Sequence, residues 1–329
     1  MLADSYGRIA TDLRFSLTDR CNLRCAYCMP PEGLEWLPKP EVLTAPEVIR
    51  LVRIGVELLG IREVRFTGGE PLLRRDLPSI VAAVSALAPR PEVSLTTNGI
   101  GLARLAAPLR AAGLDRVNVS LDTLRPEVFR KLAMRDRLPD VLDGLAAAAA
   151  AGLGPVKVNA VLMRDANDDE PASLLRYCLD HGYELRFIEQ MPLDAQHGWK
   201  RSEMVTADEI FALLSKDFTL IPEAARDRGP APAEMFLVDG GPARVGVIAS
   251  VTRPFCGSCD RVRVTADGQV RNCLFAREES DLRALLRGDA PDEAIAERWR
   301  AAVAVKLPGH GINDPTFLQP ERPMSAIGG

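Results

Sequence analysis

The segment "DLRFSLTDRCNLRCAYCMP" (residues 12–30) joins a β-type run to three closely spaced cysteines. Cys21, Cys25 and Cys28 follow a C-x3-C-x2-C pattern in a chain of 329 residues that has only seven cysteines. Residues at i, i+4 and i+7 can share one face of a helix, which would make these cysteines core side chains. The charged residues between them and the proline pair at 30–31 leave no apolar stripe for such a helix. We therefore interpret the three thiols as metal ligands.

The missing fourth ligand indicates which metal group these thiols bind. A structural zinc site would take a fourth cysteine or histidine at the usual spacing of a second ligand pair, and residues 29–60 contain neither. Three thiolates without a fourth suit a 4Fe-4S cluster with one iron open to a small molecule. The odd number of cysteines also argues against a disulfide framework.

The same segment begins a regular alternation of β-type runs and helical segments. Six runs are predicted as strands, at 12–18, 63–68, 92–97, 116–122, 156–163 and 184–191. Six β/α units predict a parallel sheet, and six units rather than eight favour an α/β fold with an incomplete (β/α)6 TIM-like barrel. Several runs end in polar or glycine residues, as in "TGGEP" and "TTNG", which predicts a pocket at the carboxyl ends of the strands.

The pattern changes after residue 222, where the helical segments give way to two hairpins. Turns are predicted at Gly240–Gly241 and at Asp267–Gly268. We expect a partial barrel over residues 1–222 and, over residues 223–329, a C-terminal α+β extension that covers the open side of the barrel.

This C-terminal region holds a second set of cysteines, Cys256, Cys259 and Cys273, in a C-x2-C-x13-C pattern. One alternative is a thioredoxin-like CxxC pair, but no helix follows it and Cys273 would be unexplained. Another is a zinc site completed by Cys178 or His310. A second three-thiolate 4Fe-4S cluster accounts for all three cysteines. Outside such a site we expect no chemistry from Cys178 or from the histidines, His181, His197 and His310.

Composition and charge exclude several other classes of protein. The net charge of −4 and the aromatic content of 5% argue against a nucleic-acid partner. The start of the chain lacks the basic and apolar regions of a signal peptide, and its longest apolar stretch is interrupted by polar residues. We expect a cytoplasmic protein without a membrane partner.

The chain resembles the radical S-adenosylmethionine (SAM) superfamily in its C-x3-C-x2-C loop after the first strand and in its Gly-Gly-Glu-Pro segment at 68–71. From residue 7 to 329 it also resembles the GTP 3′,8-cyclase family, through "RFTGGEPLLRRDL", "FIEQM", "FCGSCDRVR" and the final "GG". This resemblance implies two 4Fe-4S clusters and SAM as cofactors. It implies that a SAM-derived radical removes hydrogen from C3′ of GTP, and that C3′ then joins C8 of guanine in the first step of molybdenum cofactor biosynthesis.

Site residues follow from the same resemblance, position by position. The residues implied to bind SAM are Tyr27, Gly69, Glu70, Ser120 and Met191. The residues implied to bind GTP are Arg14, Arg65, Thr96, Lys157, Arg186, Arg261, Val262 and Arg263. Catalytic roles are implied for Arg14, Arg261, Arg263, Gly328 and Gly329. Glu63 departs from the family pattern, since relatives can carry a basic residue there, so the phosphate contacts are expected to differ.

The implied partners are GTP, a flavodoxin or ferredoxin-like electron donor, a second copy of the chain, and cyclic pyranopterin monophosphate synthase as recipient of the product. Two alternative functions remain at this point. One is a radical SAM enzyme that modifies a peptide with the help of an auxiliary cluster, although such proteins usually have more cysteines in that region. The other is a non-catalytic iron-sulfur or zinc protein.

Overall fold

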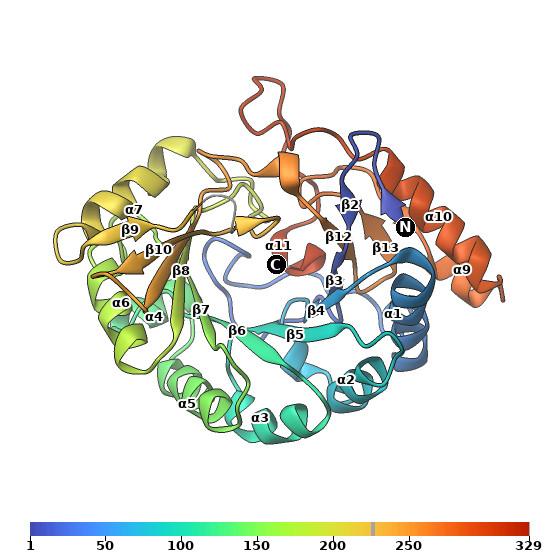
Figure 1. Ribbon diagram of the computed structural model, residues 1–329, viewed down its shortest axis with the longest axis horizontal. Helices are drawn as coiled ribbons and strands as arrows, with labels where there is room; N and C mark the ends of the chain where they lie inside the picture. The colour runs from blue at the N-terminus through green and yellow to red at the C-terminus, as the bar shows by residue number, and fades with distance from the viewer. Residues whose placement is uncertain (225–227, 329) are drawn as a thin grey trace.

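The computed structural model describes residues 1–224 and 228–328, and Gly329 lies outside the described residues. Within this part of the chain, a large mixed sheet is central, with the order β14-β13-β12-β3-β4-β5-β6-β7-β8-β11-β10-β9. Helices cover its outer face (Figure 1). The protein is therefore an α/β protein, as the alternation of strands and helices predicted.

The six predicted strands form the middle of this sheet in chain order, and each pairs in parallel with the next. They are β3 (Asp12–Ser16), β4 (Glu63–Thr67), β5 (Glu92–Thr97), β6 (Arg116–Ser120), β7 (Lys157–Val161) and β8 (Glu184–Ile188). Each observed strand lies within its predicted run, and most end a few residues earlier.

The C-terminal region extends this sheet at both edges. Strand β11 (Arg244–Ile248) pairs in parallel with β8, and β12 (Arg261–Val264) pairs in parallel with β3. The two predicted hairpins are confirmed, because β10 (Glu234–Val238) pairs antiparallel with β11 and β13 (Gln269–Arg271) with β12. The short strands β9 (Leu220–Pro222) and β14 (Ser280–Asp281) end the sheet, and β1 (Leu2–Ala3) and β2 (Ile9–Ala10) form a separate ribbon.

The helices follow the strands in the predicted order. They are α1 (Ala45–Leu59), α2 (Leu77–Ser85), α3 (Leu102–Ala111), α4 (Pro126–Ala133), α5 (Leu138–Ala150), α6 (Pro171–Asp180), α7 (Ala207–Leu214), α9 (Arg283–Arg287), α10 (Asp292–Ala304) and α11 (Met324–Ile327). Single 3-10 turns are η1 (Pro71–Leu73), η2 (Arg201–Glu203) and η3 (Cys256–Ser258). Helix α1 begins with a capping box of Thr44 and Glu47 and is followed by Gly60 in the left-handed conformation.

Successive side chains of each strand point to opposite faces of the sheet, so one face packs in the hydrophobic core and the other lines the site. Leu13 and Phe15 of β3 are fully buried in the hydrophobic core, whereas Arg14 between them lines a cavity. The same applies to Arg65, which lies between Val64 and Phe66 on β4. The inner face of the sheet is therefore polar and cationic.

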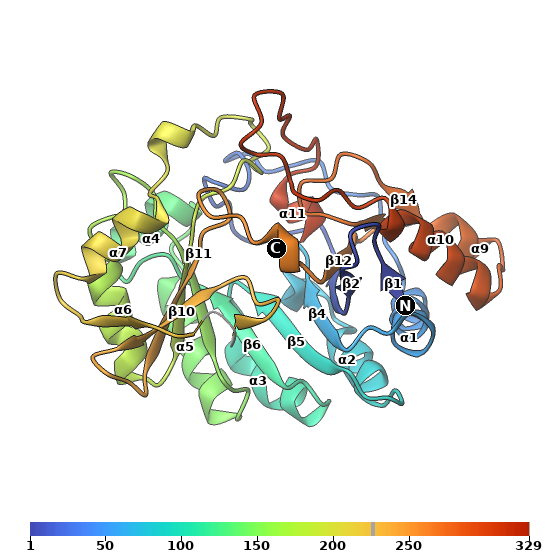
Figure 2. The ribbon, with the colours of Figure 1, turned by 45° about the horizontal axis from the view of Figure 1, so that its top comes forward.

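The last described helix, α11, lies in the space that the strands surround, whereas α9 and α10 lie outside, near α1 (Figures 1 and 2). The backbone of α11 is fixed by a hydrogen bond from Met324 N to Leu193 O, and Ile327 is fully buried.

Among the described residues, no helix combines the length and apolar character needed to cross a membrane.

Candidate functional site

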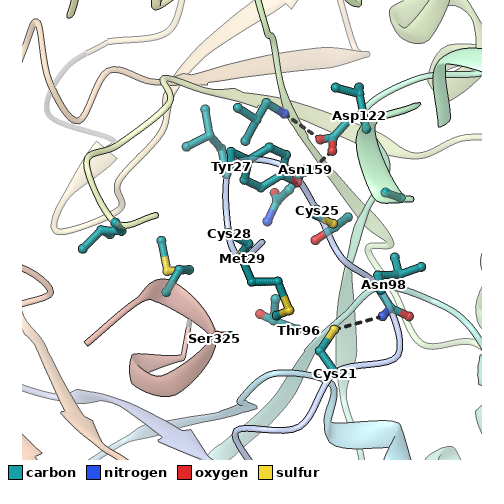
Figure 3. Close-up of a pocket in the computed structure, with 18 of the residues that line it drawn as sticks. Cys21, Cys25, Tyr27, Cys28, Met29, Thr96, Asn98, Asp122, Asn159 and Ser325 are labelled. Atoms are coloured by element: carbon teal, nitrogen blue, oxygen red, sulfur yellow. Dashed lines mark hydrogen bonds between the residues drawn. The ribbon is translucent and has the colours of Figure 1, made fainter. Parts of the chain in front are cut away.

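Two connected cavities lie on the inner side of the sheet, with volumes of about 210 and 190 Å³. Cys21, Cys25 and Cys28 line the first cavity (Figure 3). The second cavity is lined by the other set, Cys256, Cys259 and Cys273. The residues that line both cavities are Thr96, Asn159, Ile188, Met191 and Met324. The two sets of thiols, far apart in the sequence, therefore face one continuous chamber.

The N-terminal cysteine loop is held by backbone hydrogen bonds to the end of α4, from Arg24 N to Ala133 O and from Ala26 N to Leu132 O. Two glycines let a second segment lie directly against the loop. A Cβ atom at Gly68 would lie 2.3 Å from Thr18 O, and one at Gly69 would lie 2.4 Å from Arg20 O. Glycine is needed at both positions because the backbones approach so closely.

The three cysteines of this loop are partly buried, and desolvation is the largest influence on the acidity of their thiols. It raises the pKa values of Cys21 and Cys25, and it raises that of Cys28 to about 12. These thiols are therefore protonated when free and lose their protons on binding a metal. Their position around one cavity fits a group that takes three thiolates.

Tyr27 also lines the first cavity, and its ring is oriented by Asp122 at the end of β6. The tyrosine hydroxyl donates to Asp122 Oδ2 at 2.7 Å, and Val161 N donates to Asp122 Oδ1 at 2.9 Å (Figure 3). Desolvation raises the pKa of this carboxyl to about 6 despite both hydrogen bonds. Sequence reasoning missed Asp122, although "SLD" at a strand end contained it.

Glu70 is fully buried, and its carboxylate accepts hydrogen bonds from Leu72 N, Thr97 Oγ1 and Asn98 N. Asn98 in turn places its side-chain amide 3.9 Å from Cys21 Sγ. Glu70 is not among the residues that line the first cavity, whereas Gly69, Ser120 and Met191 are. Glu70 therefore positions Asn98 through the hydrogen bond from Asn98 N. This role of Glu70 was not predicted from the sequence.

The second cavity combines the C-terminal cysteines with arginines from four strands. Arg14, Arg65, Arg186, Arg261 and Arg263 all line it. Register places Arg263 beside Arg14 and Arg14 beside Arg65, so three guanidinium groups come from adjacent positions on β12, β3 and β4. Three carboxylates lie near these arginines: Asp12 is next to Arg261 in register, Asp260 Oδ1 lies 3.7 Å from Arg261 Nη1, and Glu184 accepts a hydrogen bond from Arg186. Burial acts to raise the pKa of Asp12, but the surrounding arginines outweigh it and hold that pKa below the usual value.

Such a row of cations at a buried wall fits a polyanionic ligand. Burial, reinforced by the neighbouring Arg14, lowers the pKa values of Arg65 and Arg263. Like charges this close disfavour one another, so a bound anion would stabilise the arrangement.

Four residues singled out in the sequence remain to be placed: Thr96, Lys157 and Val262, which were expected to bind GTP, and Glu63. Thr96 belongs to the wall that the two cavities share. Lys157 does not line either cavity, and its Nζ lies 4.0 Å from Glu184 Oε1. The side chain of Val262 packs in the hydrophobic core, so only its backbone faces the arginine wall. Glu63, which departs from the family pattern, pairs with Arg116 at 3.3 Å.

The chain end closes the chamber from the side of α11. Arg263 Nη1 donates to Gly328 O, and Met324 contributes to both cavities. A Cβ atom at Gly328 would lie 2.8 Å from Thr67 Cγ2, and the φ angle of this residue is +89°. Gly328 therefore lies beside Arg263 and Thr67, which line the two cavities, but it is not among the lining residues itself, and Gly329 lies outside the described residues.

The C-terminal thiols differ from the N-terminal ones in their electrostatic surroundings. Burial raises the pKa of Cys256. Burial also acts to raise the pKa of Cys259, but Arg261 and Lys306 outweigh it and hold that pKa below the usual value. His310, expected to have no chemistry, lines this cavity; its Nε2 donates to Ser250 O at 3.0 Å, and its Nδ1 accepts from Ile312 N.

The zinc alternative depends on a fourth ligand for Cys256, Cys259 and Cys273. Cys178 is fully buried in α6 and does not line the second cavity. His310, the other candidate, lines the same cavity as the three thiols. Over residues 1–224 and 228–328, no three cysteine, histidine or acidic side chains are arranged to hold a single metal ion.

Comparisons with known proteins agree with this geometry. The sequence model for the radical SAM superfamily matches residues 15–178, and the model for molybdenum cofactor synthesis C matches residues 183–312. The GTP 3′,8-cyclase of Streptomyces coelicolor is 68% identical over 329 residues, which cover 100% of this chain and 96% of that protein. The chain belongs to the GTP 3′,8-cyclase family. The family member from Mycolicibacterium smegmatis is 61% identical and covers 100% of this chain and 92% of its own length.

Solved structures of lower identity share the radical SAM fold with this family member. SuiB of Streptococcus suis has a TM-score of 0.60 at 15% identity, covering 93% of this chain and 68% of that chain. SuiB bound to the precursor peptide SuiA has a TM-score of 0.56 at 13% identity, covering 94% and 67%. The superfamily implies one 4Fe-4S cluster and SAM.

Proposed function

We propose that this chain catalyses the radical SAM cyclisation of GTP to 3′,8-cyclo-7,8-dihydro-GTP, the first step of molybdenum cofactor biosynthesis. The observation that carries the proposal is the single chamber between two sets of three cysteines, with a wall of arginines beside the second set. Relatives named GTP 3′,8-cyclase, identical at 61–68% of positions, support the same reaction.

The cofactors are assigned to the two ends of this chamber. Cys21, Cys25 and Cys28 would hold one 4Fe-4S cluster, and the C-terminal thiols would hold a second, each leaving one iron open. When bound, the first cluster and SAM supply the radical that removes a hydrogen atom from the substrate ribose. Gly69, Ser120 and Met191 would contact SAM from the first cavity, while Asp122 would fix the ring of Tyr27 beside it.

The chain's own residues hold the substrate in place. Arg14, Arg65 and Arg186 would bind the triphosphate, because charge-assisted hydrogen bonds of about 1.5–3 kcal/mol each accumulate along one wall. Arg261 and Arg263 would orient the nucleotide beside the second cluster, with Thr96 between the two cavities. Lys157 would act at longer range, since it shares the inner face of β7 with Asn159 but does not line either cavity. The Gly328 carbonyl, fixed by Arg263, would exclude water from the reacting atoms.

Several broader assignments belong to the same proposal. The parallel strands would form an incomplete (β/α)6 barrel over residues 1–222, completed by a region at 223–329. The enzyme would work in the cytoplasm as a homodimer, take electrons from a flavodoxin or ferredoxin-like donor, and pass its product to cyclic pyranopterin monophosphate synthase.

The test is direct. Reconstituted protein, purified without oxygen, should hold about eight irons per chain and convert GTP with SAM and dithionite into the cyclised nucleotide. Replacing Arg261 should weaken GTP turnover by at least tenfold while SAM binding stays near that of the parent. A control, Arg130→Ala, changes an arginine whose side chain is 62% exposed on α4 and should leave both unchanged. A loaded enzyme that cleaves SAM but leaves GTP unchanged would refute the proposal.

A further inference from the structure

Lys306 lies just beyond α10, and its side chain ends beside the second set of cysteines. The residue is 4% exposed. Its Nζ donates to Arg261 O at 3.0 Å, to Cys259 O at 3.2 Å and to Cys259 Sγ at 3.3 Å. An ammonium group has three donors, so every donor of Lys306 is directed at the segment from Cys259 to Arg261.

The charge of this ammonium has no carboxylate partner in the part of the chain that the structure describes. Its three contacts are two neutral carbonyls and one sulfur. A buried and unpaired cation is costly, typically by several kcal/mol. Arg261, the first residue of β12, adds a second positive charge near Cys259 rather than a negative one. The sulfur is therefore the only contact that can carry the compensating negative charge.

The first set of cysteines offers a comparison within the same chain. Cys21 Sγ receives a contact from the neutral amide of Asn98 at 3.9 Å, and the charged residues near this sulfur are of both signs, Glu70 and Arg24, with no ammonium of the described residues in contact with it. The ammonium contact thus distinguishes the C-terminal sulfurs from the N-terminal ones. Hydrogen bonds to sulfur and local charge are among the factors that set the reduction potential of an iron-sulfur cluster.

We propose that Lys306 is a positioning and charge-compensating residue that raises the reduction potential of the group bound by Cys256, Cys259 and Cys273. This inference rests on the proposed second 4Fe-4S cluster and deepens it. The ammonium favours the reduced state, because reduction adds a negative charge at the sulfur that it contacts. The C-terminal cluster is then easier to reduce than its three-thiolate ligation alone would make it.

The experiment isolates the C-terminal cluster in the full-length chain. Cys21, Cys25 and Cys28 are replaced together by alanine, the protein is reconstituted with iron and sulfide, and iron is counted. The cluster is then reduced stepwise with dithionite and followed by electron paramagnetic resonance. Lys306→Met should lower the midpoint potential by at least about 59 mV. For a one-electron couple this shift is a tenfold change in the ratio of reduced to oxidised cluster.

Two further variants separate charge from packing. Lys306→Gln keeps a hydrogen-bond donor but removes the charge, so its potential should also fall. Lys306→Arg keeps the charge and should stay closer to the parent than Lys306→Gln does. Lys200→Met removes an exposed lysine that pairs with Glu203 and should leave the potential unchanged. If Lys306→Met does not retain the cluster, the difference between Lys306→Gln and Lys306→Arg decides the question.

The outcomes separate this inference from the proposed function. A chain without its N-terminal cysteines that binds no iron would overturn the second cluster, and the inference with it. About four irons and equal midpoint potentials for Lys306→Gln, Lys306→Arg and the parent would overturn the role of Lys306 alone. Retained iron with a lower potential only where the charge is lost supports it.

Discussion

Gly328 occupies a position that admits no side chain without displacement. Its φ angle of +89° and the 2.8 Å separation that a Cβ atom would have from Thr67 Cγ2 both disfavour alanine. Strain of this kind costs about 1–3 kcal/mol, which the tail would relieve by leaving the chamber. We expect Gly328→Ala to reduce GTP turnover by about ten- to a hundredfold while iron content is kept.

Gly309→Ala is the matched control for this variant, because a Cβ atom there meets nothing within 4 Å. Turnover and iron content are measured for both variants in the same reconstituted preparation. Equal turnover of Gly328→Ala and the parent would show that the tail does not need to lie inside the chamber.

Lys157 supplies a pH-dependent prediction. Desolvation, with a further contribution from Arg186, lowers the pKa of its ammonium to about 8. The group is charged below that pH and loses its proton as pH rises through it, so attraction for the triphosphate weakens in the alkaline range. We expect the KM for GTP to rise above about pH 8 and Lys157→Arg to flatten this rise. A KM profile that is the same for both proteins would contradict the prediction.

At the scale of elements, an ion pair connects the start of α1 with α9 in the C-terminal region. Glu47 closes the capping box with Thr44 and also pairs with Arg287 of α9 at 2.7 Å. The hydrogen bond from Arg287 is the largest influence that lowers the pKa of Glu47, to about 2. A carboxyl with a lowered pKa in the folded state stabilises the protein above its unfolded pKa and loses this effect as pH falls through its folded pKa.

Between about pH 5 and pH 2, Glu47 should therefore contribute to acid unfolding. Glu47→Gln should lower stability at pH 7 and make the midpoint of urea unfolding less dependent on pH in that window. Glu57→Gln, an exposed position on the same helix, serves as the control. Parallel pH profiles for Glu47→Gln and the parent would argue against the ion pair.

The elements themselves were largely predictable, because their signals are local. The six strands carry β-type runs, and α1 carries its capping box in four residues. Strand β14 and helix α11 were not predicted. Ser280–Asp281 is a strand because it pairs with β13, and the position of α11 is fixed by the hydrogen bond from Met324 N to Leu193 O. Neither partner can be read from the local sequence.

Some residues of the site could be predicted from the sequence, and others could not. The cysteines were predictable from their spacing, whereas Arg14 and Arg65 were named from the family resemblance. Asp122 and Asn98 lie at the strand ends where a pocket was predicted, but their contacts with Tyr27 and Cys21 were not predictable, because the sequence does not place those segments side by side. Lys306 was not predictable either, since it reaches the site from beyond α10. Lys306 contacts Cys259 across 47 positions of sequence, and only the packed structure brings the two together.

At the scale of the whole molecule, the C-terminal region supplies a strand to each edge of the parallel sheet. Without residues 223–329, β3 and β8 would both have unpaired edges, which promote aggregation. We expect the fragment 1–222 to sediment as aggregate and co-expression of 223–329 to restore a soluble complex, as judged by size-exclusion chromatography. A soluble monomeric fragment with native-like circular dichroism would show that the N-terminal part folds alone.

The parallel pairing of β12 with β3 also has a consequence for biosynthesis. A nascent chain emerging from the ribosome exposes β3 long before β12 exists, because roughly 250 residues separate the end of β3 at Ser16 from the end of β12 at Val264. At typical translation speeds this interval lasts about 12–50 s. The edge of β3 stays unpaired throughout this time, so we expect chaperones to bind the nascent chain, and the site is complete only once Cys256 and Cys259 have been synthesised.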